Sequence, residues 1–353
     1  MTSIRDECAM TAVNDWEHER PWDTAGVYAV APGVYRIPLP LPDDGLRAVN
    51  IYVLEDEQGP VLIDSGQALA TSRTLLTAGL DVIGYSLSDV RKFLVTHIHR
   101  DHYTQAVMLR RELGTRIGLG SGERPSLKVV RNPDNDRVAA QLQLLQTCGA
   151  APLAELNRGL DDGLPGDLWE DPDDWLSAGQ TITHGSRRLD VIETPGHTRG
   201  HVVFRDDLAG LLFAGDHILP RITPSIGFEP AVTALPLRDY LNSLRLVRMQ
   251  DDSWLLPAHG PVTHSAHERI DQLLEHHAER LTASMQQVSV DDRTVMQVAE
   301  QLRWTRHLRT LHEMSSFNQM LAVLETKAHL DVLVERGRLD VRHDGGVAYY
   351  TSA

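Results

Sequence analysis

Cysteine, positive charge and long apolar runs are all scarce in this sequence. Its two cysteines, Cys8 and Cys148, lie far from any motif and provide no disulfide framework. Lysine and arginine number 34 against 49 acidic residues, a net charge of −15. This argues against non-specific binding to nucleic acid or to an anionic membrane, because both require a positive surface. The first residues lack the apolar core of a signal peptide, and no segment has the uncharged length of a membrane span. We therefore expect a cytoplasmic protein that contacts no membrane.

One short stretch, residues 95–103, carries most of the chemical information. Four strong metal-ligand side chains fall within six residues of it: His97, His99, Asp101 and His102. Residues 92–96 have the apolar character of a buried strand, and residues 104–113 have helical spacing. We predict a strand-to-helix loop, which is where α/β sheets place their chemistry.

The backbone pattern separates these four ligands into two pairs. On an extended segment His97 and His99 point the same way, because side chains repeat every two residues. Asp101 and His102 lie where the chain turns and can point to a neighbouring position. The arrangement suits two adjacent cations, one held by each pair.

Other strand ends also deliver side chains of the metal-ligand type. Each follows a short apolar run, and chance would rarely repeat that arrangement so often. These side chains are Asp64, His197, Asp216 and His259. Two roles are open for Asp64: a cap on the helix that follows from about residue 69, or a carboxylate that orients a metal-bound histidine.

With these motifs the sequence resembles the metallo-β-lactamase-fold hydrolase superfamily over roughly residues 26–265. The resemblance implies an α+β fold, an αββα sandwich of two β-sheets between helices, with a binuclear metal site at the sheet edges. Carried over by position, it assigns one metal to His97, His99 and His197. It assigns the other metal to Asp101, His102 and His259, with Asp216 bridging both.

The chain departs from the antibiotic-hydrolysing members of that family. Those enzymes typically carry a cysteine at the place of Asp216 and are exported, so we do not expect a β-lactamase. In that family Gly-Gly or Gly-Asn usually follows the histidine-rich stretch. Here Thr104 and Gln105 take that place, and we expect them to alter the wall of the substrate pocket. His201 and His217, beside ligands, are interpreted as core residues or as supports of the ligands. Four later histidines are interpreted as a solvated helix face: His264, His267, His276 and His277.

Three further regions flank or interrupt this domain: an N-terminal arm at residues 1–25, an insertion at residues 121–180 and a C-terminal module at residues 266–353. The insertion is either a solvated loop or a lid over the site, because Trp169 and Trp175 in a polar segment need something to pack on. The C-terminal module has the pattern of helices followed by a β-hairpin, a winged-helix-like arrangement. It is similar to the β-lactamase-like protein 2 group, which includes nucleases and thioesterases.

The expected chemistry is hydrolysis. Two divalent metals about 3.5–4 Å apart bind a water between them and lower its pKa towards neutrality. The resulting hydroxide attacks an acyl carbonyl or a phosphorus centre, and Asp101 is the candidate catalytic group that accepts or orients its proton. Zinc is the default for histidine-rich sites, although iron or manganese fits the same ligands.

Two classes of hydrolase remain open. The first cleaves a thioester or related acyl ester, including lactones, on a small molecule or a carrier; the second is a phosphodiesterase acting on RNA or DNA. Residues 290–353 contain eight basic and nine acidic residues, whereas a module that reads nucleic acid should be clearly basic. We therefore favour acyl hydrolysis, and expect the tail to pack on the main domain or on a second subunit, as in a homodimer. A non-enzymatic binding scaffold is the weakest alternative, because the ligand set is intact.

Overall fold

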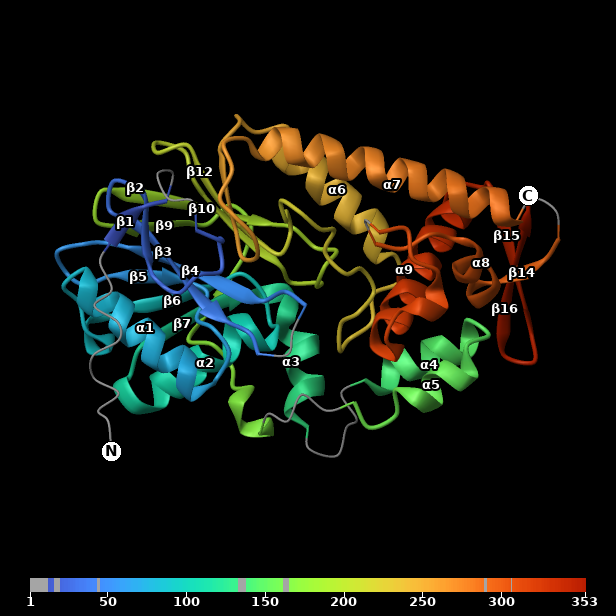
Figure 1. Ribbon diagram of the computed structural model, residues 1–353, viewed down its shortest axis with the longest axis horizontal. Helices are drawn as coiled ribbons and strands as arrows, with labels where there is room; N and C mark the ends of the chain where they lie inside the picture. Colours follow the sequence, from blue (N-terminus) through green and yellow to red (C-terminus); the bar gives the residue numbers. More distant parts are fainter. Residues whose placement is uncertain are drawn as a thin grey trace.

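The computed structural model describes residues 12–15, 20–42, 45–132, 138–160, 165–288, 291–305 and 307–353. Cys8 and most of the predicted N-terminal arm lie outside these residues, as do residues 161–164 of the predicted insertion. Two sheets with helices on both sides form the larger part of the molecule, and helices with a small sheet form the rest (Figure 1).

The first sheet has eight strands in sequence order. They are β1 (Ala12–Asn14), β2 (Val27–Ala31), β3 (Val34–Pro40), β4 (Ala48–Leu54), β5 (Val61–Ile63), β6 (Lys92–Val95), β7 (Arg116–Gly120) and β8 (Asp174–Leu176). Strands β2 to β5 pair antiparallel, as the succession of short strands with turn signals predicted. Strands β5 to β8 pair parallel, so the loops that follow β5 and β6 leave the sheet at the same edge.

The second sheet has five strands and packs face to face on the first. Its order is β13 (Trp254–Pro257), β12 (Leu211–Gly215), β11 (Val202–Asp206), β10 (Arg187–Glu193) and β9 (Thr181–His184). Buried apolar side chains from both sheets form one cluster between them, for example Leu94 from the first sheet and Phe204 from the second. The rings of Tyr52 and Phe213 meet edge to face at 5.5 Å across this layer.

Helices cover the outer face of each sheet. The first sheet packs on α1 (Ala70–Val82), α2 (Arg100–Leu113) and α3 (Arg124–Arg131), and the second on α6 (Pro236–Arg248) and the start of α7 (Ala266–Val288). Short 3₁₀ turns are η2 (Leu87–Asp89), η3 (Ser121–Glu123), η4 (Gly166–Leu168) and η5 (Leu311–Glu313). The predicted αββα sandwich is confirmed. Within the described residues, no helix is both long and apolar enough to span a membrane.

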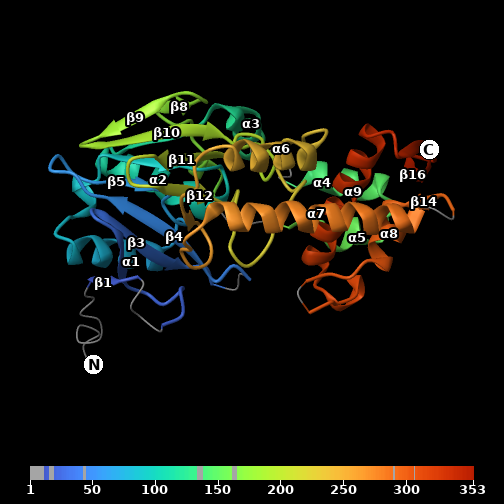
Figure 2. The ribbon, with the colours of Figure 1, turned by 90° about the horizontal axis from the view of Figure 1, so that it is seen from above.

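The C-terminal part is built around α9 (Ser316–Glu335). Helices α4 (Ala139–Thr147), α5 (Ala151–Leu156), α8 (Val295–Gln301) and α7 all pack on it. A three-stranded sheet of β14 (Arg293–Thr294), β16 (Val347–Ser352) and β15 (Leu339–Asp344) completes this part. The predicted helices and hairpin are present, and Figure 2 shows α7 leading into them from the sandwich. Helices α4 and α5 come from the predicted insertion, which therefore contributes to this body.

The two tryptophans of the insertion pack on the sandwich. The Trp169 ring stacks on Tyr103 of α2, with centroids 6.4 Å apart, and is buried. The Trp175 ring lies under the guanidinium of Arg124 at 4.1 Å. Acidic neighbours such as Glu170 pair with arginines of α2. These contacts account for both tryptophans without an acyl pocket, and a lid role for the segment stays a prediction.

The prediction of a solvated histidine face on α7 is wrong for His277. Its side chain is fully buried, meets Tyr240 edge to face at 5.5 Å and stacks on His329 at 5.3 Å. His264 is exposed, whereas His267 and His276 are half-buried. The reason is that α9 covers this side of α7, a long-range contact that the helix periodicity alone does not reveal.

Candidate metal centre

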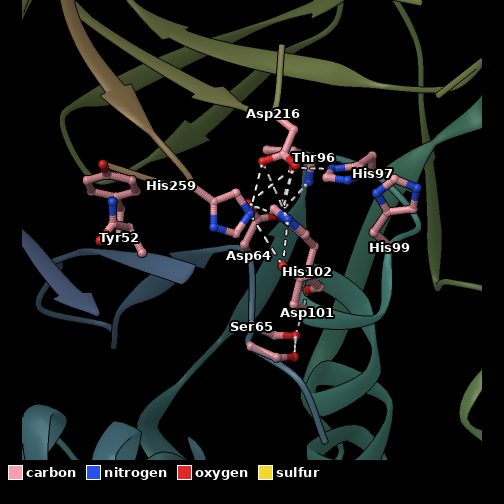
Figure 3. Close-up of polar contacts among 12 residues, drawn as sticks. Tyr52, Asp64, Ser65, Thr96, His97, His99, Asp101, His102, Asp216 and His259 are labelled. Carbon is pink, nitrogen blue, oxygen red and sulfur yellow. Dashed lines mark hydrogen bonds and ion pairs between the residues drawn. The ribbon is translucent and has the colours of Figure 1, made fainter. Parts of the chain in front are cut away.

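The seven predicted ligands meet at one edge of the two sheets. Figure 3 labels all of them except His197. His97 and His99 lie between β6 and α2, whereas Asp101 and His102 lie in the first turn of α2. This helix begins at Arg100, four residues earlier than the apolar spacing suggested. His197 follows β10, Asp216 follows β12 and His259 follows β13.

The ligand atoms form two groups. One atom from each of four residues lies within 4.8 Å of the others: His97, His99, His197 and Asp216. The second group, defined the same way, is Asp101, His102 and His259. Apart from Asp216, which was expected to bridge, these are the two sets that the family resemblance assigned to two metals.

Asp216 reaches both groups. Its Oδ2 lies 3.5 Å from His197 Nε2, whereas its Oδ1 lies 3.3 Å from His259 Nε2 and 3.7 Å from His102 Nε2. A carboxylate whose two oxygens face different ligand groups would be able to contact an ion held by either group.

Five of the seven predicted ligands end in a buried atom that has no hydrogen-bond partner among the described residues. These atoms are His97 Nε2, Asp101 Oδ2, His102 Nε2, Asp216 Oδ1 and His259 Nε2. Buried polar atoms in native proteins nearly always have a partner, so five unpartnered ligand atoms in one place require an explanation. Nitrogen and carboxylate donors are the ligands that zinc and related divalent metals prefer. The residues present therefore fit a divalent metal centre.

Main-chain carbonyls orient two of the histidines. His197 Nδ1 lies 2.8 Å from the carbonyl of Ser225, and His259 Nδ1 lies 2.7 Å from the carbonyl of Ala48. Because a carbonyl can only accept, each Nδ1 donates its proton and each Nε2 keeps a lone pair directed at the centre. This is the usual outer support of a metal-binding imidazole.

Asp64 orients a third histidine. Its Oδ2 lies 2.9 Å from His102 Nδ1, and its Oδ1 accepts the Thr96 amide at 2.8 Å. The residue holds a left-handed backbone conformation, φ 61°, which is rare outside glycine and costs free energy. The predicted helix-cap role of Asp64 is wrong: α1 begins after Leu69, and no side chain of the described residues caps it. Asp64 is thus placed to fix the ring of His102.

Close backbone packing brings Asp216 into the centre. Gly215 has φ 51°, and a Cβ there would lie 2.7 Å from Thr96 Oγ1 and 2.8 Å from His201 Nε2. His201 is fully buried; its Nε2 accepts the Asp216 amide at 3.1 Å, and its Nδ1 pairs with Thr194 Oγ1 at 2.9 Å. His201 therefore supports the ligand beside it rather than joining the ligand set.

The electrostatics of the site favour a cation. Burial and the neighbouring histidines lower the pKa of His97; burial is also the main reason why the pKa of His99 falls to about 3 and that of His197 to about 4. These imidazoles are neutral at pH 7, as ligands must be. Burial raises the pKa of Asp101, but His102 and His259 lower it by more, so this carboxyl is ionised.

The pKa of His102 moves in the opposite direction. Burial lowers it, but the carboxylates of Asp64, Asp101 and Asp216 raise it by more, so the net shift is well upward. The charges that attract a proton to this ring would attract a divalent cation in the same way.

One buried acid of the site was not predicted from the sequence. Glu123, in η3, is fully buried and accepts hydrogen bonds from the Thr198 hydroxyl and the Ile98 amide. It thereby joins the loops that carry His97 and His197. Burial raises the pKa of Glu123 to about 8. Its local sequence, a polar turn, contains no signal of this burial.

Comparison with known proteins supports this description. The model of a family described as the Metallo-beta-lactamase superfamily matches residues 44–259. A crystal structure of the metallo-beta-lactamase family protein TTHA1429 from Thermus thermophilus superposes with a TM-score of 0.75 at 26% identity, covering 92% of this chain and all of the other.

Three relatives in sequence are informative. The probable metallo-hydrolase YqjP of Bacillus subtilis is 24% identical over 89% of this chain and 96% of its own length. A beta-lactamase-like protein 2 homolog of Caenorhabditis elegans is 25% identical over 67% of this chain and 63% of its own length, which confirms the predicted similarity to that group. The atrochrysone carboxyl ACP thioesterase of Aspergillus fumigatus is 23% identical over 68% of this chain and 44% of its own length.

Proposed function

Because the chain belongs to the metallo-beta-lactamase superfamily, we propose that it is a hydrolase that uses two divalent metal ions to cleave a thioester or a related acyl ester. The observation that carries this proposal is the set of five buried, unpartnered ligand atoms that face one another across the two ligand groups. Zinc is the expected metal, since histidine nitrogens dominate the donors.

Each residue has a defined task in this proposal. His97, His99 and His197 would hold one ion. Asp101, His102 and His259 would hold the other, and Asp216 would contact both. When bound, such a pair of ions lowers the pKa of a water and polarises the oxygen of a substrate. The outer contacts of Asp64, Ser225 and Ala48 keep the ligands in place without rearrangement.

Asp101 is proposed to handle the proton. Its Oδ2 lies 3.5 Å from His102 Nε2 and 3.4 Å from His259 Nε2, so the carboxylate faces the space between the groups. The ionised state that these histidines favour is the one that can accept a proton from an attacking water or orient it.

Charge favours an acyl substrate over nucleic acid. The chain carries a net charge of −15, and residues 290–353 carry one more acidic than basic residue. A protein that binds phosphodiester backbones gains most of its affinity from a positive surface. The relative named as a thioesterase acting on an acyl carrier supports the same choice.

The test combines metal analysis with a substrate panel. Zinc-, manganese- or iron-loaded protein is assayed on a thioester, a lactone and bis-p-nitrophenyl phosphate. We expect turnover of the thioester or lactone and a loss of about 100-fold or more in Asp101→Asn, as is typical for a general base. Asp207→Asn, an exposed control, should keep full activity. Turnover of the phosphodiester alone would favour the phosphodiesterase, and a protein that binds none of these metals would refute both.

A further inference from the structure

A second set of ligand-type side chains lies far along the chain from the metal centre, where α7 meets α9. His276 and His277 belong to α7 and Glu325 belongs to α9. One ligand atom from each of the three lies within 4.8 Å of the others. Figure 1 shows α7 leaving the sandwich and running beside α9 in the C-terminal part.

A chain of hydrogen bonds fixes which nitrogen of His277 is available. His329 Nδ1 lies 2.8 Å from the carbonyl of Glu325, which can only accept, so this Nδ1 donates. With its proton on Nδ1, a neutral His329 ring presents Nε2 as an acceptor. His277 Nδ1 lies 3.1 Å from that Nε2 and must therefore donate to it. The proton of neutral His277 is thus on Nδ1, and its Nε2 carries a lone pair.

This lone pair has no donor facing it. His277 is fully buried, and no described residue forms a hydrogen bond with its Nε2. Within the described chain, the carboxylate of Glu325 also forms no hydrogen bond or ion pair. A buried imidazole acceptor beside a half-buried carboxylate is unfavourable unless a cation or a proton lies between them.

Among the described residues, Arg280 acts on Glu325 by its charge but forms no ion pair with it. Its guanidinium lies over the Trp304 ring at 4.2 Å and donates to the carbonyl of Arg303 at 3.0 Å. Arg280 therefore leaves the acceptor atoms of His277 and Glu325 unfilled.

We propose that His276, His277 and Glu325 form a further metal site that binds a divalent transition metal such as zinc. Two imidazoles and one carboxylate are a common zinc ligand set, with a water completing the tetrahedron. Because the ligands come from two helices, the ion would join the middle of α7 to α9. Its role would be to hold the C-terminal part in place. The proposal does not depend on the function proposed for the main centre.

The neighbouring charge of Arg280 sets an expectation for affinity. A positive charge nearby opposes the binding of a cation. This site also offers only three protein ligands to its ion, whereas the main centre shares seven between two ions. The additional ion should therefore dissociate first when a mild chelator is titrated.

The test measures zinc per chain in full-length protein after loading and dialysis. We expect close to three ions in the wild type and two in His276→Ala and in Glu325→Gln. These variants are chosen because both side chains are only partly buried, and His277 with its hydrogen bond to His329 stays intact. The matched controls His343→Ala and Glu279→Gln change exposed residues of the same types and should keep three ions.

A variant of the main centre separates the two proposals. Asp216→Ala should lose ions from the main centre and still bind one zinc, which should raise its melting temperature; the added change Glu325→Gln should abolish that shift. If the wild type holds two ions, and His276→Ala and Glu325→Gln hold the same two, the further site does not exist and the main centre stands. If Asp216→Ala leaves the zinc count unchanged while Glu325→Gln lowers it, the main centre fails and the further site stands.

Discussion

The most direct test of how the ligands are held is Asp64→Asn. Both carboxylate oxygens of Asp64 act as acceptors, Oδ2 towards His102 Nδ1 at 2.9 Å and Oδ1 towards the Thr96 amide at 2.8 Å. The Thr96 hydroxyl also lies 3.0 Å from Oδ1. Asparagine has the same shape but only one acceptor oxygen, so one of these contacts becomes donor against donor.

The size of the effect follows from the kind of bond that is lost. A hydrogen bond to a charged group contributes about 1.5–3 kcal/mol, and about 1.4 kcal/mol is a tenfold change in affinity. Loss of an outer partner of a metal ligand typically weakens metal binding about 10- to 100-fold, and this range agrees with the free energy of the lost hydrogen bond. We expect this loss for the ion held with His102 and little change for the ion held by His97, His99 and His197.

The assay is competition for zinc against a chromophoric chelator, which resolves the two affinities of the main centre from that of any more weakly held ion. Asp207→Asn serves as the control, since Asp207 is more than half exposed and pairs only with Arg205 at the end of β11 far from the ligands. Two affinities equal to those of the wild type would show that Asp64 does not orient His102. Selective loss of the other ion would show that the ligands are wrongly grouped.

Four further outcomes are expected. Asp216→Ala should release zinc from both groups of the main centre, because its oxygens face both; a zinc count that drops by one would refute the bridge. Burial raises the pKa of Glu123 from 4.5 to about 8, so the metal-free fold loses stability as the pH rises through that interval. The variant Glu123→Gln should therefore have a higher melting temperature than the wild type at pH 9 and the same melting temperature at pH 4. Truncation of the chain after Gln287 should lower the stability of the protein. The full-length protein should show no binding to RNA or DNA in gel shifts at physiological salt.

The local part of the site is accessible from sequence alone. Each ligand follows a short apolar strand, and the strand period by itself places His97 and His99 on one side. The start of α2 is not accessible in this way, because Asp101 and His102 contribute nothing to an apolar helical period. Their first-turn position still brings both side chains to the second ligand group.

The parts that escaped prediction depend on contacts between distant segments. His277 and His329 lie on different helices and meet only when α7 and α9 pack. Glu123 is buried because the loops after β6 and β10 close over it. A polar residue whose partners are remote looks like any surface residue in the sequence, and for that reason the histidines of α7 were assigned to solvent.

The same reasoning explains which supports of the metal centre could be foreseen. His102 is oriented by a side chain, Asp64, which stands at a strand end and is visible as a carboxylate. His197 and His259 are oriented by the carbonyls of Ser225 and Ala48. Every residue type carries a carbonyl, so no sequence pattern marks these two positions, and most substitutions there would leave the hydrogen bond in place. Sensitivity to point mutation should therefore concentrate at Asp64, although all three histidines need the same support.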